Sequence, residues 1–172
     1  MAISSTPHTS QNSQEDTKIL IADDDDAMRY LLREALMQWG YFVIEAKNGE
    51  EAWEAIHQPD PPHILILDWK MPKLDGITLS QRIRKELDFY PYIIFLTQVS
   101  GAENIIKGFD AGANEFLMKP VNFPELHNRI ISGEKIIEFV KIIEEQNHVL
   151  NSCVSYIKTL EQLILLLRKM KS

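Results

Sequence analysis

Short apolar runs alternate with amphipathic stretches along most of this 172-residue chain. The runs are rich in Ile, Leu, Val and Phe, which is typical of strands that are buried on both faces of a sheet. We therefore expect five strands, at Lys18–Ala22, Tyr41–Ala46, His63–Leu67, Tyr92–Leu96 and Glu115–Met118.

The stretches between these runs repeat their apolar residues at helical spacing. They predict helices at about Asp26–Trp39, Gly49–His57, Ile77–Leu87 and Glu103–Ala111, with a last helix opening near Pro124. Gly40 and Gly112 stand where two of these helices end, a position that favours glycine because the backbone there takes a positive φ. Regular alternation of strand and helix predicts an α/β fold with a doubly wound, five-stranded parallel sheet.

The two ends of the chain differ from this pattern. Residues 1–17 are rich in Ser, Thr, Asn and Gln and are expected to form a disordered tail, because so little apolar surface cannot offset the entropy lost on ordering. From Gly133 to Lys171 there is hardly a helix breaker, so we expect a helical extension over residues 132–172.

Composition and charge narrow the classes of partner. The net charge is −7 and the negative excess lies before Gly133, which argues against direct nucleic-acid binding, since phosphate contacts need clustered Lys and Arg. Apolar runs such as Leu163–Leu167 are too short to cross a membrane and the N-terminus lacks a signal pattern, so we expect a cytoplasmic protein. One cysteine, Cys153, excludes an internal disulfide framework.

Three acids follow directly on two predicted strands. Asp23 and Asp24 come after the first strand, and Asp68 comes after the third. In an open parallel sheet the chemistry gathers at the carboxyl ends of the strands, so neighbouring strands would bring these carboxylates into one pocket. Such a cluster of like charges favours a divalent cation, and oxygen donors point to Mg²⁺ or Mn²⁺.

Two further groups are placed at the same edge by the same rule. Thr97 ends the fourth predicted strand, and Lys119 follows the fifth. A carboxylate nucleophile, a divalent cation, a hydroxyl and an ammonium are the groups that phosphoryl transfer to a protein requires. The sequence therefore predicts that Asp68 accepts a phosphoryl group.

The acidic run Asp23–Asp26 allows other interpretations. Acids after a strand are often solvated turn residues or helix caps, and we expect Asp26 to cap a helix that begins at Ala27. A calcium-binding loop does not fit, because Met28 stands where such a loop needs glycine and Ala27 stands at a ligand position.

Four motifs in this order and spacing resemble the receiver domains of two-component response regulators, including those of the chemotaxis type. They are Lys18–Asp26, Asp68–Gly76, Phe95–Thr97 and Phe116–Pro120. The resemblance covers residues 18–131 and implies a flavodoxin-like sheet of strand order 2-1-3-4-5. It also implies that a histidine kinase or a phosphotransfer protein phosphorylates Asp68.

The resemblance further implies roles for single residues. Mg²⁺ would be bound directly by Asp24, through water by Asp23, by a carboxylate oxygen of Asp68 and by the backbone carbonyl of Lys70. Lys119 would pair with the phosphoryl oxygens, in front of a cis Lys119–Pro120 peptide.

A conformational switch is implied in the same way. Thr97 would move inward to bond the phosphoryl group, and Phe116 would turn inward with it. A buried Phe116 without a role is the alternative. Gln98 and Lys70 depart from the commonest pattern of the family, and we expect both to tune reaction rates at the mouth of the pocket.

Three classes of function are compatible with an aspartate at the end of a strand. The resemblance implies a signalling protein that catalyses only its own phosphorylation and dephosphorylation. A phosphatase of the haloacid dehalogenase type would need a second acid two residues after Asp68, where this chain has Lys70. A receiver that is never phosphorylated and acts only as a binding module is disfavoured by the intact carboxylates and Lys119.

The extension carries an apolar stripe at coiled-coil spacing, formed by Ile136, Val140, Ile143, Asn147, Leu150, Val154 and Ile157. Leu160, Ile164 and Leu167 continue it after an extra three-residue step that breaks the register. We expect a homodimer through this helix, with Asn147 favouring a parallel pair. Packing of the helix on its own domain is the alternative, and a lipid-surface helix is disfavoured because its polar face is not strongly basic.

Overall fold

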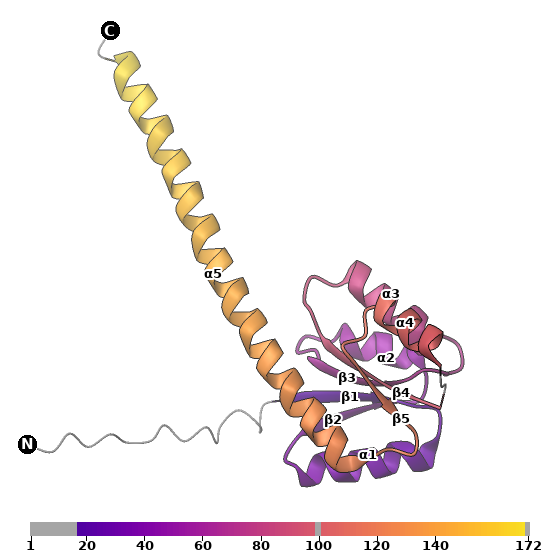
Figure 1. Cartoon of the computed structure of the whole chain (residues 1–172). Coiled ribbons are helices and arrows are strands. Elements are labelled where there is room, and N and C mark those ends of the chain that lie inside the picture. Colours follow the sequence, from indigo (N-terminus) through magenta and orange to yellow (C-terminus); the bar gives the residue numbers. More distant parts are fainter. Residues whose placement is uncertain (1–16, 99–100, 171–172) are drawn as a thin grey trace, which may run out of the picture. The chain divides into compact units, whose positions relative to one another are not determined.

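The computed structural model describes residues 17–98 and 101–170, the last eight of these by their backbone alone. A five-stranded parallel sheet in the order β2-β1-β3-β4-β5 forms its centre (Figure 1). The strands are β1 (Lys18–Ala22), β2 (Phe42–Ala46), β3 (Ile64–Asp68), β4 (Tyr92–Thr97) and β5 (Glu115–Met118). Both the number of strands and the implied strand order are confirmed.

Helices cover both faces of the sheet. α1 and the first turns of α5 lie on one face, and α2, α3 and α4 lie on the other (Figure 1). Their bounds are α1 (Asp26–Gln38), α2 (Gly49–Ile56), α3 (Gly76–Glu86), α4 (Ala102–Asp110) and α5 (Phe123–Met170). The doubly wound α/β fold predicted from the alternating pattern is therefore confirmed.

The strands are buried on both faces, as their uninterrupted apolar sequence predicted. In β1, Leu20 belongs to the core cluster under α2 and α3, whereas Ile19 and Ile21 alternate with it and are fully buried as well. The other face is closed by apolar residues of α1 and α5, namely Leu32, Leu36, Leu126 and Ile130, all completely buried. This two-sided core fixes the sheet on which the site is built.

The start of α1 differs from the sequence prediction. Asp25, and not Asp26, is the N-cap, and its Oδ1 accepts hydrogen bonds from the backbone N–H of Ala27 at 2.9 Å and of Met28 at 3.4 Å. The prediction failed because any acid in this run can cap a helix, and only the geometry of the turn selects one. The two helix ends at Gly40 and Gly112 were predicted correctly, and both glycines have a positive φ.

Arg84 holds the end of the sheet where β4 and β5 begin. Its guanidinium donates to the carbonyl oxygens of Gly112 and Pro91 at 2.7 Å each, and to Oδ1 of Asn114 at 2.9 Å. The same Oδ1 accepts the backbone N–H of Ile93 at 2.8 Å. The Arg84 side chain therefore links the loops that precede two neighbouring strands, β4 and β5.

The chain divides into two compact units, Met1–Glu134 and Lys135–Ser172. The second unit continues α5 as one helix, and most of its described side chains are exposed. In the part of the chain that the structure describes, none of the helices has an apolar run of the length needed to cross a membrane. Residues 1–16 of the predicted disordered tail, and the side chains of Ile164 and Leu167 in the predicted seam, lie outside the described residues.

Candidate functional site

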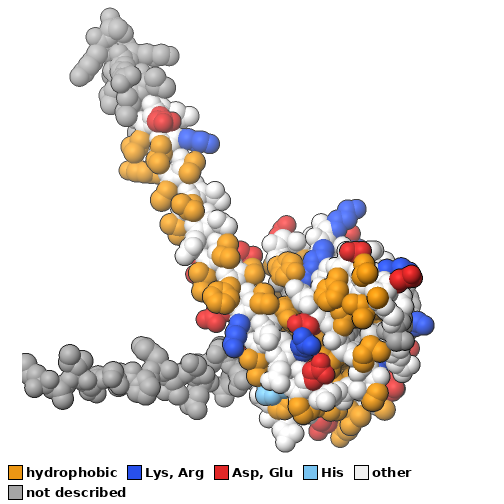
Figure 2. Space-filling model, viewed as in Figure 1, with side chains coloured by type: hydrophobic (Ala, Val, Ile, Leu, Met, Phe, Trp, Pro, Cys, Tyr) orange, Lys and Arg blue, Asp and Glu red, His pale blue; other side chains and the backbone are white. Residues whose placement is uncertain are grey.

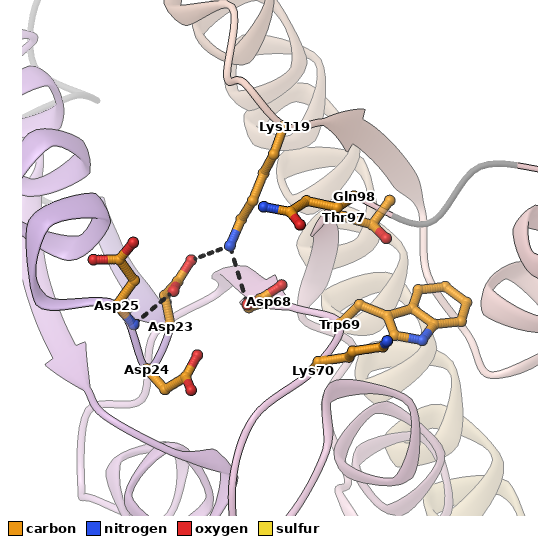
Figure 3. A pocket seen from close by; sticks show the side chains of 9 residues that line it. All are labelled: Asp23, Asp24, Asp25, Asp68, Trp69, Lys70, Thr97, Gln98 and Lys119. Atoms are coloured by element: carbon orange, nitrogen blue, oxygen red, sulfur yellow. Dashed lines mark hydrogen bonds and ion pairs between the residues drawn. The ribbon is translucent and has the colours of Figure 1, made fainter.

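The parallel register brings the carboxyl ends of four strands to one edge of the sheet. Ala22 of β1 pairs with Leu67 of β3, and Asp68 of β3 pairs with Leu96 of β4. An open cavity of about 470 Å³ lies at this edge (Figure 3). It is lined by Asp23, Asp24, Asp25, Asp68, Trp69, Lys70, Thr97, Gln98 and Lys119.

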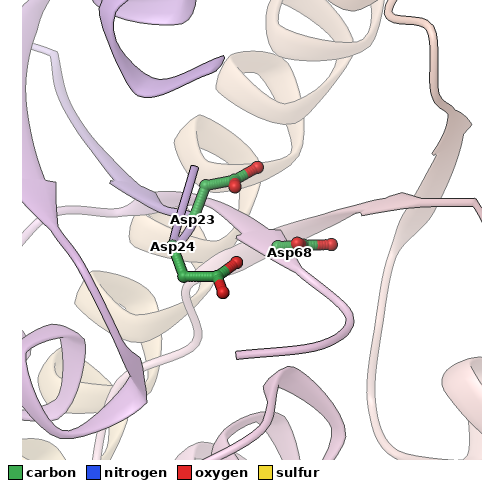
Figure 4. Close-up of side chains that lie close together, drawn as sticks. All are labelled: Asp23, Asp24 and Asp68. Atoms are coloured by element: carbon green, nitrogen blue, oxygen red, sulfur yellow. The ribbon is translucent and has the colours of Figure 1, made fainter. Parts of the chain in front are cut away.

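Three carboxylates meet in this cavity, as the sequence predicted. One oxygen from each of Asp23, Asp24 and Asp68 lies within 4.8 Å of those of the other two (Figure 4). Their exposure differs: Asp23 is buried, Asp24 is exposed, and the side chain of Asp68 is 13% exposed. Asp68 can therefore be reached by a reactant from outside, while Asp23 forms the floor of the site.

Lys119 bridges two of these acids. Its Nζ lies 2.7 Å from Oδ2 of Asp23 and 3.0 Å from Oδ2 of Asp68 (Figure 3). The backbone N–H of Lys119 donates to the carbonyl oxygen of Thr97 at 2.8 Å, which ties the end of β5 to β4. The peptide that follows, Lys119–Pro120, is cis, as the resemblance implied.

The environment shifts the pKa values of both members of this ion pair upward. Burial raises the pKa of Asp68, and the charge of Asp23 adds to this, while the hydrogen bond from Lys119 opposes it. For Lys119, burial lowers the pKa, but hydrogen bonds to Asp23 and Asp68 outweigh burial and raise it. One ammonium thus faces an excess of negative charge, which makes the cavity a place for further positive charge.

The donor set fits a hard divalent cation. Three carboxylates that converge within 4.8 Å supply oxygen alone, which suits Mg²⁺ or Mn²⁺ better than a metal that prefers nitrogen or sulfur. Among the described residues, no second group of His, Cys, Asp and Glu converges in this way.

Two further residues lie at the rim of the cavity. The backbone N–H of Lys70 donates to Asp68, and the side chains of Lys70 and Gln98 are exposed.

An aromatic cluster connects the site to α4. Phe116 is half-buried, and its ring centroid lies 4.8 Å from that of Phe109, 5.6 Å from Phe95 and 6.1 Å from Trp69, the neighbour of Asp68. A Cβ atom at Gly108 would overlap the ring of Phe116, so the bare backbone of α4 provides the space for this ring. Thr97 is 1% exposed at the end of β4.

Sequence reasoning missed one charged residue beside the site. Arg29 is 5% exposed, and its Nη1 donates to the backbone carbonyl oxygen of Asp23 at 2.6 Å. It lies on the same helical stripe as Leu32 and Leu36, three and seven residues on, which are completely buried. A basic residue at an apolar position of the stripe was the signal that could have revealed it.

Comparisons with known proteins agree with this geometry. Residues 19–131 match the family model of the response regulator receiver domain. Over 113 residues the chain is 42% identical to "Probable transcriptional regulator ycf27" of Guillardia theta, which covers 66% of this chain and 43% of the relative. It is also 35% identical over 105 residues to chemotaxis protein CheY1 of Helicobacter pylori strain 26695, covering 60% of this chain and 85% of that protein.

Solved structures show the same fold. The receiver domain of the Francisella response regulator 1452 superposes with a TM-score of 0.65 at 30% identity, covering 69% of this chain and 97% of that one. A CheY-like receiver domain protein from Methanospirillum hungatei gives a TM-score of 0.65 at 29% identity, covering 71% and 96%. The chain belongs to the response regulator receiver domain family of two-component signalling systems. It spans about half the length of the ycf27 relatives that it matches.

Proposed function

We propose that the chain accepts a phosphoryl group on Asp68, in a reaction that depends on Mg²⁺ or Mn²⁺. The observation that carries this proposal is the position of Asp68, with Lys119 3.0 Å away and two further carboxylates converging on the same point. The donor would be a histidine kinase or a phosphotransfer protein. Apart from its own phosphorylation and dephosphorylation, the domain would catalyse no reaction.

The transfer is a displacement at phosphorus. An oxygen of Asp68 forms a new O–P bond while the P–N bond of a phosphohistidine breaks, and the imidazole nitrogen keeps the electron pair and takes up a proton. The product is an acyl phosphate on Asp68. The raised pKa of Lys119 keeps its ammonium charged, so that it can neutralise a phosphoryl oxygen in place of one of its present carboxylate partners.

The acid cluster would hold the cation. Asp24 and a carboxylate oxygen of Asp68 would bind it directly, Asp23 would bind it through water, and the backbone carbonyl of Lys70 would add a further oxygen. When bound, the cation supplies charge neutralisation between the carboxylates and the incoming phosphoryl oxygens. The convergence of the three acids in the structure supports this assignment.

Thr97 and Phe116 would form the switch. Phosphorylation adds negative charge beside Thr97, whose hydroxyl would donate to a phosphoryl oxygen. A movement of Thr97 would reach the Phe116 ring and α4 through β4, because Phe95 of β4 packs on Phe116 at 5.6 Å and Phe109 of α4 packs on it at 4.8 Å. The switch would change the surface that the domain offers to partners.

A homodimer through α5 is the second part of the proposal. Seam residues of the second unit are widely exposed, including Ile143 at 56% and Leu150 at 61% (Figure 2). An apolar stripe of this length in water favours association, and its four-three spacing is self-complementary between two copies. Asn147 lies in the seam and would favour a parallel, in-register pair at some cost in stability.

We propose a cytoplasmic protein that makes no direct contact with DNA and does not bind membranes. The curated name of the ycf27 relatives refers to transcription, but the alignment with the Guillardia protein covers only 43% of its length. The acidic balance of this chain, at −7, disfavours phosphate binding by its surface.

Labelling of Asp68 tests the main proposal. Acetyl phosphate should add one phosphoryl group to the wild-type chain, as measured by intact mass, only when Mg²⁺ is present, and Asp68→Asn should abolish this. Equal labelling of the Asp68→Asn variant would refute the site. A chain that never labels would leave the pure binding module as the function, whereas steady turnover of a chromogenic phosphate ester would support the phosphatase alternative.

A further inference from the structure

A buried guanidinium lies behind the acid cluster. Arg29 stands in the first turns of α1, and its side chain is 6% exposed. It makes three polar contacts: Nη1 donates to the carbonyl oxygen of Asp23 at 2.6 Å, Nη2 donates to Asp26, and Nε lies 3.9 Å from Oε2 of Glu45 on β2. A cation this deeply buried costs several kcal/mol to desolvate, so its contacts must be held in place.

The first of these contacts acts on the site itself. The carbonyl of Asp23 belongs to the peptide that joins Asp23 to Asp24, so the orientation of this peptide determines where both carboxylates point. A second bond holds the same turn from the other side, since Oδ1 of Asp23 accepts the backbone N–H of Asp25 at 3.0 Å (Figure 3). Without Arg29, the carbonyl of this peptide would lose the charged donor that holds its orientation.

We propose that Arg29 is the positioning residue of the divalent-cation site. It touches neither the cation nor the phosphoryl group, and acts by holding the Asp23–Asp24 peptide so that both acids converge on Asp68. The inference rests on the proposed function, since it assumes that the cluster binds a cation. Outer residues that orient metal ligands typically change metal affinity by about 10- to 100-fold when they are lost.

Charge repulsion works in the opposite direction but is the weaker effect here. A cation near a metal site repels the metal, so removal of Arg29 would strengthen binding if only its charge mattered. Asp26 and Glu45 both lie on the guanidinium and neutralise it. Loss of the hydrogen bond to the Asp23 carbonyl should therefore affect cation binding more than loss of the positive charge of Arg29.

Arg33 provides a matched control. It lies one helical turn after Arg29 on α1 and pairs with the same acid, Glu45, at 3.3 Å, but it makes no contact with Asp23. Replacement of Arg33 by Gln removes a positive charge from the same helix and a partner from Glu45. Arg29→Gln removes, in addition, the bond to the Asp23 carbonyl and the ion pair with the exposed Asp26. Of these two contacts, only the bond to the Asp23 carbonyl reaches the acid cluster.

Titration with Mn²⁺ tests the inference, with free Mn²⁺ measured by electron paramagnetic resonance and Mg²⁺ as competitor. Arg29→Gln should bind Mn²⁺ about tenfold more weakly than wild type, while Arg33→Gln should bind within a factor of about two of wild type. Arg29→Lys keeps the positive charge but lacks the planar set of N–H donors of the guanidinium, so it should also bind Mn²⁺ more weakly than wild type. This second variant decides the matter if Arg29→Gln does not fold.

The outcomes separate the inference from the function on which it rests. Folded Arg29 variants that bind Mn²⁺ as tightly as wild type would overturn the positioning role, even if they are less stable in the absence of metal. A wild-type chain that labels on Asp68 without binding Mn²⁺ or Mg²⁺ would overturn it as well. Failure of Asp68 labelling, with Mn²⁺ binding weakened only in the Arg29 variants, would refute the proposed function and leave the positioning role standing.

Discussion

At the scale of single residues, Asp68 sits in surroundings that disfavour its charged form. Burial and the neighbouring Asp23 raise its pKa, and the ammonium of Lys119 compensates only in part. A group whose folded-state pKa lies above its unfolded value binds protons more readily in the folded protein, so its ionisation favours unfolding. The negative charge of Asp68, the residue that would take the phosphoryl group, therefore destabilises the folded state.

Asp68→Asn should raise the free energy of unfolding at pH 7 by about 1 kcal/mol when no divalent cation is present. The advantage of Asn should be small below about pH 4, where the unfolded carboxyl is protonated, and grow as the pH rises through the folded-state pKa. Urea denaturation in a chelator at several pH values measures this difference. A stability difference that does not change with pH would show that the ionisation of Asp68 is not its cause.

Gln98 and Lys70 stand at the rim of the cavity, where water must approach the phosphorus of an acyl phosphate. Gln98→Ala and Lys70→Ala should each alter the dephosphorylation rate, and by much less than the loss of Lys119 alters phosphorylation, because neither binds Asp68 through its side chain. The decay of the phosphorylated form, followed by mass, gives the rates. An unchanged rate in the double variant would remove both residues from the mechanism.

The strand-end acids, Thr97 and Lys119 were predictable from sequence because each is adjacent to an apolar run whose end is easily located. The convergence of Asp23, Asp24 and Asp68 followed from a parallel sheet in which the first and third strands are neighbours, an order that the resemblance to receiver domains implied. Arg29 could not be assigned a role, because its partner is a backbone carbonyl, which leaves no mark in the sequence. The choice of Asp25 over Asp26 as the helix cap likewise depends on turn geometry.

At the scale of elements, the helices of the receiver are fixed by their caps as well as by their apolar stripes. Asp25 caps α1 and Asn48 caps α2, each through backbone N–H groups of the first turn. Asp75 caps α3 through Thr78 N–H at 2.8 Å. Two of these caps stand directly after the loops that leave β1 and β3, so the caps also define the edge at which the site forms.

Asp25→Ala should lower the free energy of unfolding by about 1 kcal/mol, because two N–H groups of α1 lose their acceptor. Asp88→Ala is the control, since it removes the same charge from an exposed position outside any helix. Thermal or urea denaturation of both variants measures the effect. If the control lost as much stability as Asp25→Ala, net charge and not capping would be responsible.

The extent of α5 was foreseeable, because few residues after Gly133 break a helix. What covers its apolar stripe was not foreseeable, since the same four-three spacing suits a second copy of the chain or another helix.

The ends of the strands were also predicted within about one residue. The way Phe116 packs on Gly108 was not, because it depends on ring orientations that the sequence does not encode locally.

At the scale of the whole molecule, the two compact units differ in how they achieve stability. The receiver buries both faces of its sheet between helices. The second unit is a single helix whose described side chains are largely exposed, and one helix alone has no core. Its apolar residues therefore need a partner, and we propose that this partner is a second copy.

Sedimentation should show a dimer for the full chain and a monomer for a version that ends at Glu134. Ile143→Lys with Leu150→Lys should also give a monomer, because two charges enter the seam. Glu145→Lys with Ser152→Lys adds the same residues away from the seam and should leave the dimer intact. A monomeric full chain, or a dimer that survives in the shortened version, would contradict the coiled-coil proposal.

The bonds of Arg84 to the loops before β4 and β5 have a consequence for local opening of the backbone. Beside Arg84, the backbone N–H of Ile93 donates to Oδ1 of Asn114 at 2.8 Å, and the backbone N–H of Asn114 donates to the carbonyl oxygen of Ile93 at 2.9 Å. The amides of Asp25 and Trp69 lie instead at the cavity, where the acids gather. Amide hydrogen exchange should therefore be slowest near Arg84 and faster at the cavity. Addition of Mg²⁺ should slow exchange mainly at the cavity, so that the two ends of one sheet respond to the cation as separate regions.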